Sequence, residues 1–226
     1  MTTQGEQIAE IWKDPGFARE WEAHDSFNDF LVLPRRLSSA LIAQERPQAR
    51  VVLDVASGPG AFLAEFLDQL PEARGIWTDA SEAMLDAAHE RLAGYGDRVQ
   101  FVVADMTDLA SAGLPHDIDV VATSRAAHHL DRAGLHAFYA ETTDRLTPGG
   151  WLVNLDHIGP PDVWDRRLRT LRKKFVAESD GPKHHHNYPL TSIQDHLDAF
   201  HAAGIDDVEV AWRAFYTALF VGRKDG

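Results

Sequence analysis

The chain has 226 residues and a mass of 25.1 kDa, which is enough for one ordinary domain with at most a small cap. Hydrophobic residues make up 44% and charged residues 25%, and these near-average values exclude a disordered chain, a fibre and a coiled coil. The net charge of −13 disfavours nucleic acid as the main partner, because an acidic surface repels phosphate groups.

The first 48 residues show helical spacing and no strand pattern. Pro34 suits the first position of a helix, and Leu37, Leu41 and Ile42 follow on one helical face. Five aromatic residues in this part predict either packing against the domain or a helical flap over a pocket; they are Trp12, Phe17, Trp21, Phe27 and Phe30. The polar start lacks the features of a signal peptide, so we expect a cytoplasmic protein.

Residues 50–158 alternate between strand and helix patterns. Helices are predicted between the strands, and Ser81 and Asp131 are placed to cap two of them. Repeated units of this kind indicate an α/β fold that is doubly wound, with a mostly parallel sheet and helices on both faces. The predicted strands cover residues 51–55, 75–78, 99–103, 118–123 and 151–155.

After residue 158 the alternation stops. We expect a helical insertion with an apolar stripe, which consists of Trp164, Leu168, Leu171 and Phe175. Basic residues lie off this stripe and indicate either a solvated face or a site for an acidic partner or substrate. Thr191 is placed to cap a further helix, and two short strands then predict an antiparallel hairpin. The expected organisation is a single domain in four parts, covering residues 1–48, 49–158, 159–190 and 191–226.

The turn after the first predicted strand carries the strongest functional signal. It begins with Asp54 and continues with the small residues Ala56, Gly58 and Gly60, which let a ligand approach the backbone closely. In an open α/β sheet, ligands bind at the carboxyl ends of the strands. Asp54 lies at such an end, where its carboxylate can accept a hydrogen bond from a ligand ammonium group.

Two common phosphate-binding motifs fit this turn poorly. A dinucleotide fingerprint is disfavoured because Phe62 and Leu63 stand where further glycines are expected, and because Asp54 repels phosphate. A P-loop is excluded because no Gly-Lys-Ser/Thr sequence follows the turn. The pattern therefore predicts a cofactor with an amino group and no phosphate.

Four more segments follow the turn at regular spacing: residues 78–85, 104–106, 119–130 and 146–152. Together with residues 54–60, they resemble the motifs of the class I S-adenosylmethionine-dependent methyltransferases, in the family's order. The resemblance covers roughly residues 45–158 and the final hairpin, and Ala56 stands at the family's first glycine. It implies a Rossmann-like, seven-stranded sheet whose last strand is antiparallel, with S-adenosyl-L-methionine as the cofactor.

The resemblance also implies roles for individual residues. Asp79 and Ala80 would contact the ribose hydroxyl groups, although Asp79 also suits a helix cap or turn. Asp105 and Met106 would contact the adenine, although Asp105 also suits a loop turn. A weaker expectation is that Ser124 contacts the methionine part. Met84 suits packing on the adenine and packing in the core equally well.

Two histidines are candidates for a general base, which a hydroxyl acceptor needs near neutral pH. His129 belongs to a pair with His128 that we expect to begin the helix after the fourth strand, with one ring facing the core and one the cleft. His157 directly follows the fifth strand. The alternative interpretation is that His128 and His129 have a structural role, in packing and helix capping, and no role in catalysis. No metal site is predicted, because the adjacent residues of His184-His185-His186 cannot easily share one ion.

The expected reaction is O- or N-methylation by in-line displacement, and the expected partner is a small-molecule methyl acceptor, aromatic or carboxylate-bearing. The N-terminal flap and the insertion at 159–190 are expected to bind this acceptor. Aromatic residues of these two parts favour the first class, and Arg35 and Arg36 favour the second. The absence of a long apolar run predicts no membrane span, and the protein is expected as a monomer or homodimer. Other hypotheses are methylation of tRNA, cofactor binding without catalysis as a partner subunit or sensor, and the disfavoured NAD-dependent oxidoreductase.

Overall fold

The computed structural model of the chain describes residue 16 and residues 29–175 and 189–226. Several predictions fall outside these ranges, and the structure does not test them. They concern the aromatic residues Trp12, Phe17, Trp21, Phe27 and Tyr188 and the segment His184-His185-His186.

The described residues form a seven-stranded sheet with the order β3-β2-β1-β4-β5-β7-β6. Strands β1 to β5 are parallel, and β7 runs antiparallel to both β5 and β6. The predicted fold class, with its antiparallel last strand, is therefore confirmed. The strands are β1 Val51–Val55, β2 Arg74–Asp79, β3 Val99–Val103, β4 Ile118–Ser124, β5 Leu146–His157, β6 Asp207–Ala214 and β7 Thr217–Arg223.

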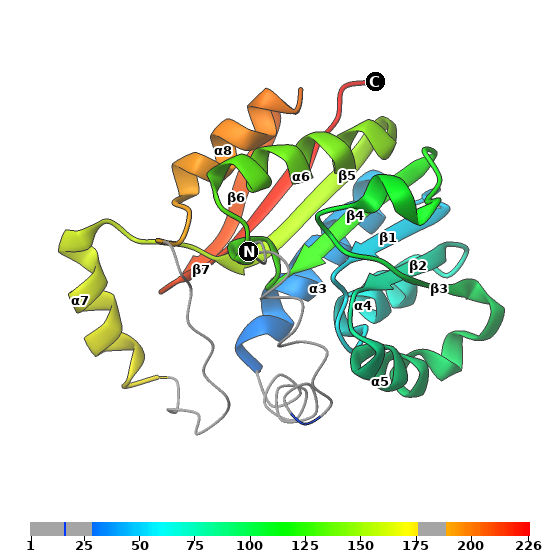
Figure 1. Cartoon of the computed structure of the whole chain (residues 1–226), viewed down its shortest axis with the longest axis horizontal. Coiled ribbons are helices and arrows are strands. Elements are labelled where there is room, and N and C mark those ends of the chain that lie inside the picture. Colours follow the sequence, from blue (N-terminus) through cyan, green and yellow to red (C-terminus); the bar gives the residue numbers. More distant parts are fainter. Residues whose placement is uncertain (1–15, 17–28, 176–188) are drawn as a thin grey trace, which may run out of the picture.

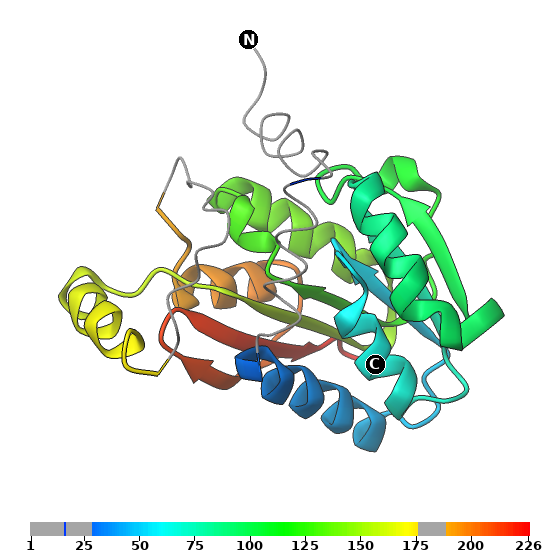
Figure 2. The same ribbon diagram turned by 90° about the horizontal axis from the view of Figure 1, so that it is seen from below.

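Helices cover both faces of the sheet (Figures 1 and 2). On one face lie α3 (Asp29–Glu45), α4 (Ala61–Gln69) and α5 (Glu82–Leu92), whose buried side chains form one apolar cluster with that face of the strands. On the other face, α6 (Arg132–Arg145) and α8 (Ile193–Ala202) pack over a second cluster. Three short 3-10 helices connect these elements: η1 (Ala93–Arg98), η2 (Leu109–Ala112) and η3 (Ala127–His129).

The starts of α3 and α8 differ from the prediction, each for a reason of tertiary packing. Pro34 lies inside α3, because the helix extends upstream to bury Leu31, which is 1% exposed, and to pack Phe30 on Trp212. Helix α8 is capped by Ser192, one residue after the predicted Thr191. The side chain of Thr191 instead lies 3.0 Å from a ring nitrogen of a buried histidine, so it is not available as a cap.

Strand β5 begins at Leu146, so residues 146–150 precede the predicted start of this strand at residue 151. Pairing with the C-terminus holds this segment in place: the Gly149 amide donates to the Lys224 and Asp225 carbonyls, and the Lys224 amide donates to the Gly150 carbonyl. Gly149 has a φ of 70°, so glycine meets a conformational need here. A local sequence pattern cannot show this pairing, because its two partners are about 75 residues apart.

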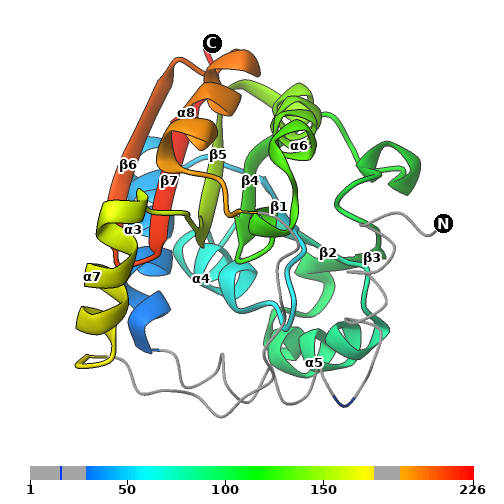
Figure 3. The same ribbon diagram turned by 60° about the vertical axis from the view of Figure 1, so that its left-hand side comes forward.

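The predicted helical insertion contains α7 (Asp162–Arg172), which projects beyond the β6–β7 edge of the sheet (Figures 1 and 3). Its contact with the body includes a hydrogen bond from the Tyr216 hydroxyl to the Asp165 carbonyl at 2.7 Å. The apolar stripe faces largely outward, with Trp164 51% and Phe175 73% exposed. No helix within the described ranges is long and apolar enough to cross a bilayer.

Candidate active site

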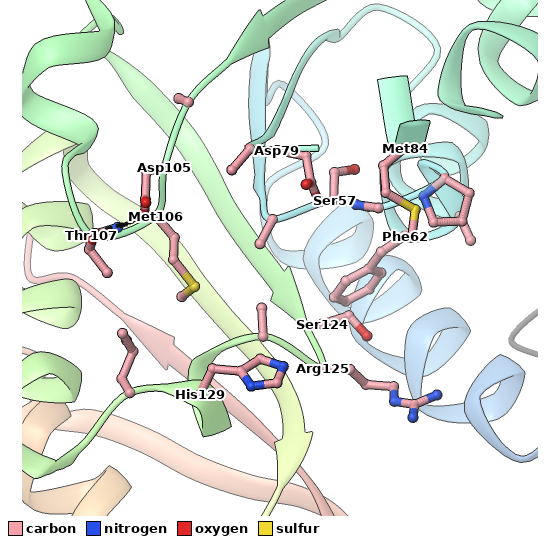
Figure 4. A pocket seen from close by; sticks show the side chains of 18 of the residues that line it. Ser57, Phe62, Asp79, Met84, Asp105, Met106, Thr107, Ser124, Arg125 and His129 are labelled. Atoms are coloured by element: carbon pink, nitrogen blue, oxygen red, sulfur yellow. Dashed lines mark hydrogen bonds between the residues drawn. The ribbon is translucent and has the colours of Figure 1, made fainter. Parts of the chain in front are cut away.

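A pocket of about 1030 Å³ opens at the carboxyl ends of the strands, beside the β1–β4 pair. This pair is the point where the strand order reverses, which is the ligand site of open α/β sheets. Figure 4 shows Asp79 and Asp105 on one side of the pocket and Ser124, Arg125 and His129 on the other. Nine of the predicted site residues line it: Ala56, Gly58, Asp79, Ala80, Met84, Asp105, Met106, Ser124 and His129.

The turn between β1 and α4 forms the floor of the pocket. Ala56, Gly58 and Gly60 all adopt left-handed backbone conformations, with φ of 50°, 56° and 81°. Alanine at position 56 is therefore strained where the family pattern has glycine. At Gly60, an added Cβ would lie 2.7 Å from Leu92 Cδ1, so glycine lets α4 and α5 pack closely. Gly60 itself does not line the pocket.

Asp54 lies beneath this turn and does not line the pocket. Its Oδ2 accepts hydrogen bonds from Ser57 Oγ at 2.6 Å and from the Leu63 amide at 3.0 Å, which tie the turn to the start of α4. Its Oδ1 is buried and has no hydrogen-bond partner among the described residues. Burial raises the pKa of Asp54 to about 7, although the Ser57 hydrogen bond and the charge of Arg35 oppose the shift.

Asp79 is both a turn residue and a pocket residue: its carboxylate accepts hydrogen bonds from the surrounding turns, and it lines the pocket. Its Oδ2 accepts a hydrogen bond from the Gly58 amide and its Oδ1 one from the Ser81 amide, both at 2.9 Å. Burial raises the pKa of Asp79, and these backbone hydrogen bonds lower it. Each carboxylate oxygen can accept one more hydrogen bond, as a pair of vicinal hydroxyl groups requires. Met84 likewise lines the pocket and belongs to the core.

Asp105 also combines a turn with a place in the pocket. Its Oδ1 accepts hydrogen bonds from the amide and the hydroxyl of Thr107, at 2.8 and 2.7 Å, which orients the carboxyl group. Across the pocket, Ser124 Oγ is buried and has no hydrogen-bond partner within the described ranges. These acceptors suit the hydroxyl, amine and ammonium groups of S-adenosylmethionine, so the residues present fit that cofactor.

Two arginines bring positive charge to the same pocket. Arg35 reaches it from α3 and is 8% exposed. Arg125 follows the end of β4 with a φ of 57°, and its amide donates to the Leu155 carbonyl at 2.9 Å. Sequence reasoning missed Arg125, although its place directly after a strand end was the available signal. The other lining residues that it did not assign are Ser57, Pro59, Ala61, Phe62, Ala104, Thr107, Ala126 and Leu130.

The histidines after β4 do not begin a helix as predicted. Residues 127–129 form the 3-10 helix η3, and α6 starts only at Arg132, because the Asp131 side chain caps it by accepting from the Gly134 amide. As expected, one residue of the pair lies in the core and one at the pocket: His128 is 1% exposed, and His129 lines the pocket.

The second candidate base, His157, lies outside the pocket lining. Its ring centroid is 5.0 Å from that of His128, and its Nδ1 is 3.4 Å from Thr217 Oγ1. The structure therefore separates the two candidates: His129 belongs to the pocket lining, and His157 does not. In the part of the chain that the structure describes, no three His, Asp or Glu side chains gather in an arrangement that could hold a metal ion.

Comparisons with known proteins agree with this geometry. Residues 52–150 match a family model described as a methyltransferase domain. The chain is 34% identical over 111 residues to 3-amino-4-hydroxybenzoate 4-O-methyltransferase of Streptomyces cremeus, covering 49% of this chain and 29% of that enzyme. It is 30% identical over 167 residues to demethylmenaquinone methyltransferase of Bacteroides fragilis, covering 70% of this chain and 65% of that enzyme.

A solved structure shares the fold over most of the chain. It is an O-methyltransferase family 2 protein from Planctomyces limnophilus, with a TM-score of 0.69 and 22% identity, covering 93% of this chain and 62% of that one. The chain thus spans less than two thirds of each of these three relatives. Matched motifs, sheet order and pocket lead to one assignment: over residues 52–150, the chain carries a methyltransferase domain of the class I S-adenosylmethionine-dependent family.

Proposed function

We propose that the protein transfers a methyl group from S-adenosylmethionine to a hydroxyl group of a small-molecule acceptor, with His129 as the general base. The observation that carries the proposal is that one pocket is lined both by the acids Asp79 and Asp105 and by the imidazole of His129. A cofactor and an acceptor that share this pocket would meet next to a group that can take a proton.

The residues of the pocket divide into a cofactor part and an acceptor part. In the proposal, Asp79 accepts hydrogen bonds from the ribose hydroxyl groups, and Asp105 and the Met106 amide bind the adenine. Ser124 Oγ accepts from the ammonium group, and Asp54 holds the turn in shape from below. When bound, S-adenosylmethionine supplies a methyl group on a cationic sulfur, which keeps the electrons of the broken carbon–sulfur bond.

His129 acts on the acceptor. Its neutral ring takes the hydroxyl proton as the acceptor oxygen forms its bond to the methyl carbon, so the acceptor leaves as a neutral ether and the histidine as an imidazolium. General-base help of this kind contributes roughly 10²- to 10⁴-fold to a rate. The ring then returns its proton to water for the next cycle.

The acceptor that the pocket favours is an acidic or aromatic hydroxyl compound. Arg35 and Arg125 offer more positive charge than the single carboxylate of the cofactor requires, and Phe62 and Leu130 offer apolar surface. The Streptomyces cremeus relative, named for a hydroxybenzoate, supports this class. Of the described residues in the predicted acceptor-binding parts, 29–48, 159–175 and 189–190, Arg35 alone lines the pocket.

The first test is calorimetric titration of the purified protein with S-adenosylmethionine. We expect micromolar affinity for the wild type. Asp79→Ala removes both carboxylate oxygens from the ribose site, so we expect at least about tenfold weaker binding, equivalent to about 1.4 kcal/mol. Asp97→Ala is the matched control, because Asp97 is exposed and does not line the pocket.

Equal affinity of the wild type and Asp79→Ala, with both proteins folded, would contradict the proposed cofactor site. A screen of hydroxybenzoates follows, with product detected by mass spectrometry. Binding without turnover on this panel or on tRNA would favour a non-catalytic role. Turnover on tRNA with binding that weakens steeply as salt rises would favour the macromolecular alternative.

A further inference from the structure

A carboxylate with no direct access to the pocket lies behind His129. Asp156, near the end of β5, is fully buried. Its Oδ2 accepts a hydrogen bond from the His128 amide and its Oδ1 one from the His157 amide, both at 2.7 Å. Two backbone donors therefore aim at the two carboxylate oxygens, an arrangement that suits the ionised form.

The ring of His128 connects this carboxylate to the pocket. Its Nδ1 is 2.6 Å from Asp156 Oδ1, which fixes the plane of the ring. The ring centroids of His128 and His129 are 4.1 Å apart with an angle of 36° between the planes, so the two imidazoles are in contact in a tilted arrangement. Of Asp156, His128 and His129, the last alone lines the pocket.

We propose that Asp156 and His128 are positioning residues for His129: the carboxylate fixes the His128 ring, this ring supports the His129 ring at the pocket, and the buried negative charge stabilises the imidazolium that forms during proton transfer. The inference rests on the proposed function, because it assumes that His129 is the base. Neither positioning residue touches the acceptor.

The surrounding charges agree with this arrangement. Burial raises the pKa of Asp156, and the electrostatic interactions with His157, His196 and His129 lower it. The attraction between Asp156 and His129 is mutual, so the same interaction that favours the anion on Asp156 favours the cation on His129. Burial lowers the pKa of His196 to about 4, so this ring contributes no charge near neutral pH.

Other charged groups around His129 act in both directions. Arg125 lies on the same side of the pocket and opposes a cation on His129 (Figure 4). Asp131 caps α6 two residues further along the chain, and Asp79 and Asp105 lie across the pocket. The carboxylates of Asp79 and Asp105 line the pocket, where the cofactor is proposed to bind. Asp156 differs because it lies outside the pocket lining and is fully buried, in a low dielectric where a charge has a stronger effect.

The test compares Asp156→Asn with His128→Asn. The first removes the charge at nearly constant shape. The second keeps a donor where His128 Nδ1 stands and keeps the Asp156 charge, but removes the ring that supports His129. Asp144→Asn is the control for loss of an exposed carboxylate, since the Asp144 side chain is 74% exposed. Unfolding curves and titration with S-adenosylhomocysteine establish that each variant is folded with an intact cofactor site.

The main readout needs no acceptor: the pH titration of the His129 ring by NMR, with its signal assigned by its loss in His129→Gln. In Asp156→Asn we expect the proton affinity of His129 to fall about three- to tenfold. In His128→Asn we expect a change below about twofold in that affinity. With an acceptor from the hydroxybenzoate screen, we expect kcat of His128→Asn to fall about tenfold at a similar KM.

An unchanged His129 titration in folded Asp156→Asn would overturn the electrostatic role, and full kcat in His128→Asn would overturn the support role. Should Asp156→Asn not fold, the His128→Asn result decides alone. Failure of the proposed function is recognised separately: it appears as absent binding of S-adenosylhomocysteine by the wild type, or as full activity of His129→Gln.

Discussion

At the scale of single residues, His196 is a fully buried titratable side chain that lies outside the pocket lining. Its Nδ1 is 2.8 Å from the Tyr139 hydroxyl, and its Nε2 is 3.0 Å from Thr191 Oγ1. Asn154 Nδ2 donates to the same Tyr139 hydroxyl at 2.7 Å, and the ring stacks on Phe220. Since burial lowers the pKa of His196 to about 4, the folded protein requires the neutral ring.

This requirement predicts a loss of stability in mild acid. The pKa of His196 is about 4 in the folded chain and 6.5 in the unfolded chain, so between these values the unfolded state binds the proton. The free energy of unfolding therefore falls as the pH drops below 6.5, by about 2 kcal/mol on reaching pH 5. Urea unfolding at pH 7.5 and pH 5 measures this term, with His196→Gln as the non-titrating reference. Equal pH dependence in the two proteins would refute it.

At the scale of elements, α8 is fixed at its start by a reciprocal cap. Ser192 Oγ accepts from the Asp195 amide at 3.2 Å, and Asp195 Oδ2 accepts from the Ser192 amide at 2.8 Å. Arg132, at the start of α6, forms an ion pair with the same Asp195. The cap therefore orders α8 and also aligns it with α6, the other helix on that face. Helix α7 has no side-chain cap and no buried side chain.

Removal of this cap should cost measurable stability. Ser192→Ala leaves the Asp195 amide without its hydroxyl acceptor, and we expect the free energy of unfolding to fall by about 1 kcal/mol. Gln194→Ala is the matched control, because Gln194 lies in the first turn of α8 with an exposed side chain. Chemical unfolding of both variants gives the comparison. A loss of the same size in Gln194→Ala would show that removing any polar side chain from this turn lowers stability, and would contradict a specific effect of the cap.

At the scale of the whole molecule, the two ends of the sheet have different roles. The pocket lies at the carboxyl ends of the strands, and an ion pair holds the amino ends together. Asp119 Oδ1 accepts from Arg46 Nε at 3.0 Å, and Asp119 Oδ2 accepts from the Arg50 and Val51 amides at 2.7 and 3.1 Å. Arg46 also donates to the Gly149 carbonyl at 2.8 Å. This network joins α3 to β1, β4 and β5.

Because the pocket and the Asp119 ion pair lie at opposite ends of the sheet, we expect Asp79→Ala to weaken mainly cofactor binding and Asp119→Ala to weaken mainly stability. Asp119→Ala removes the ionic partner of a largely buried guanidinium and leaves the Arg50 and Val51 amides without their acceptor, so we expect the free energy of unfolding to fall by about 3 kcal/mol. Its affinity for S-adenosylmethionine should stay within about twofold of the wild-type value in the folded protein. Asp79→Ala should lose at least about tenfold in this affinity, and its loss of stability, from the freed Gly58 and Ser81 amides, should be smaller than that of Asp119→Ala. Calorimetric titration and urea unfolding of both proteins test this, and a cofactor affinity lost in Asp119→Ala would contradict it.

The sequence was sufficient for much of this architecture. Strands β1 and β3 have their predicted bounds, because each is a short apolar run between clear turn signals. The pocket acids Asp79 and Asp105 were identified through the resemblance to the family's motifs, and the position of the pocket follows from the rule that ligands bind at the carboxyl ends of the strands. Packing between distant segments was not visible. Such packing decides where α3 starts. It also brings Asp156, near the end of β5, into contact with His128, which follows the end of the neighbouring strand β4.

The buried indole of Trp77 has a practical consequence. Its Nε1 donates to the Gly58 carbonyl at 2.8 Å, directly beneath the turn that forms the floor of the pocket. Indole fluorescence responds to the field of a bonded carbonyl, so movement of this turn would change the emission of Trp77. With phenylalanine at the other five tryptophan positions, the protein would carry a native optical probe. Stopped-flow recordings could then time the arrival and departure of the cofactor without any label.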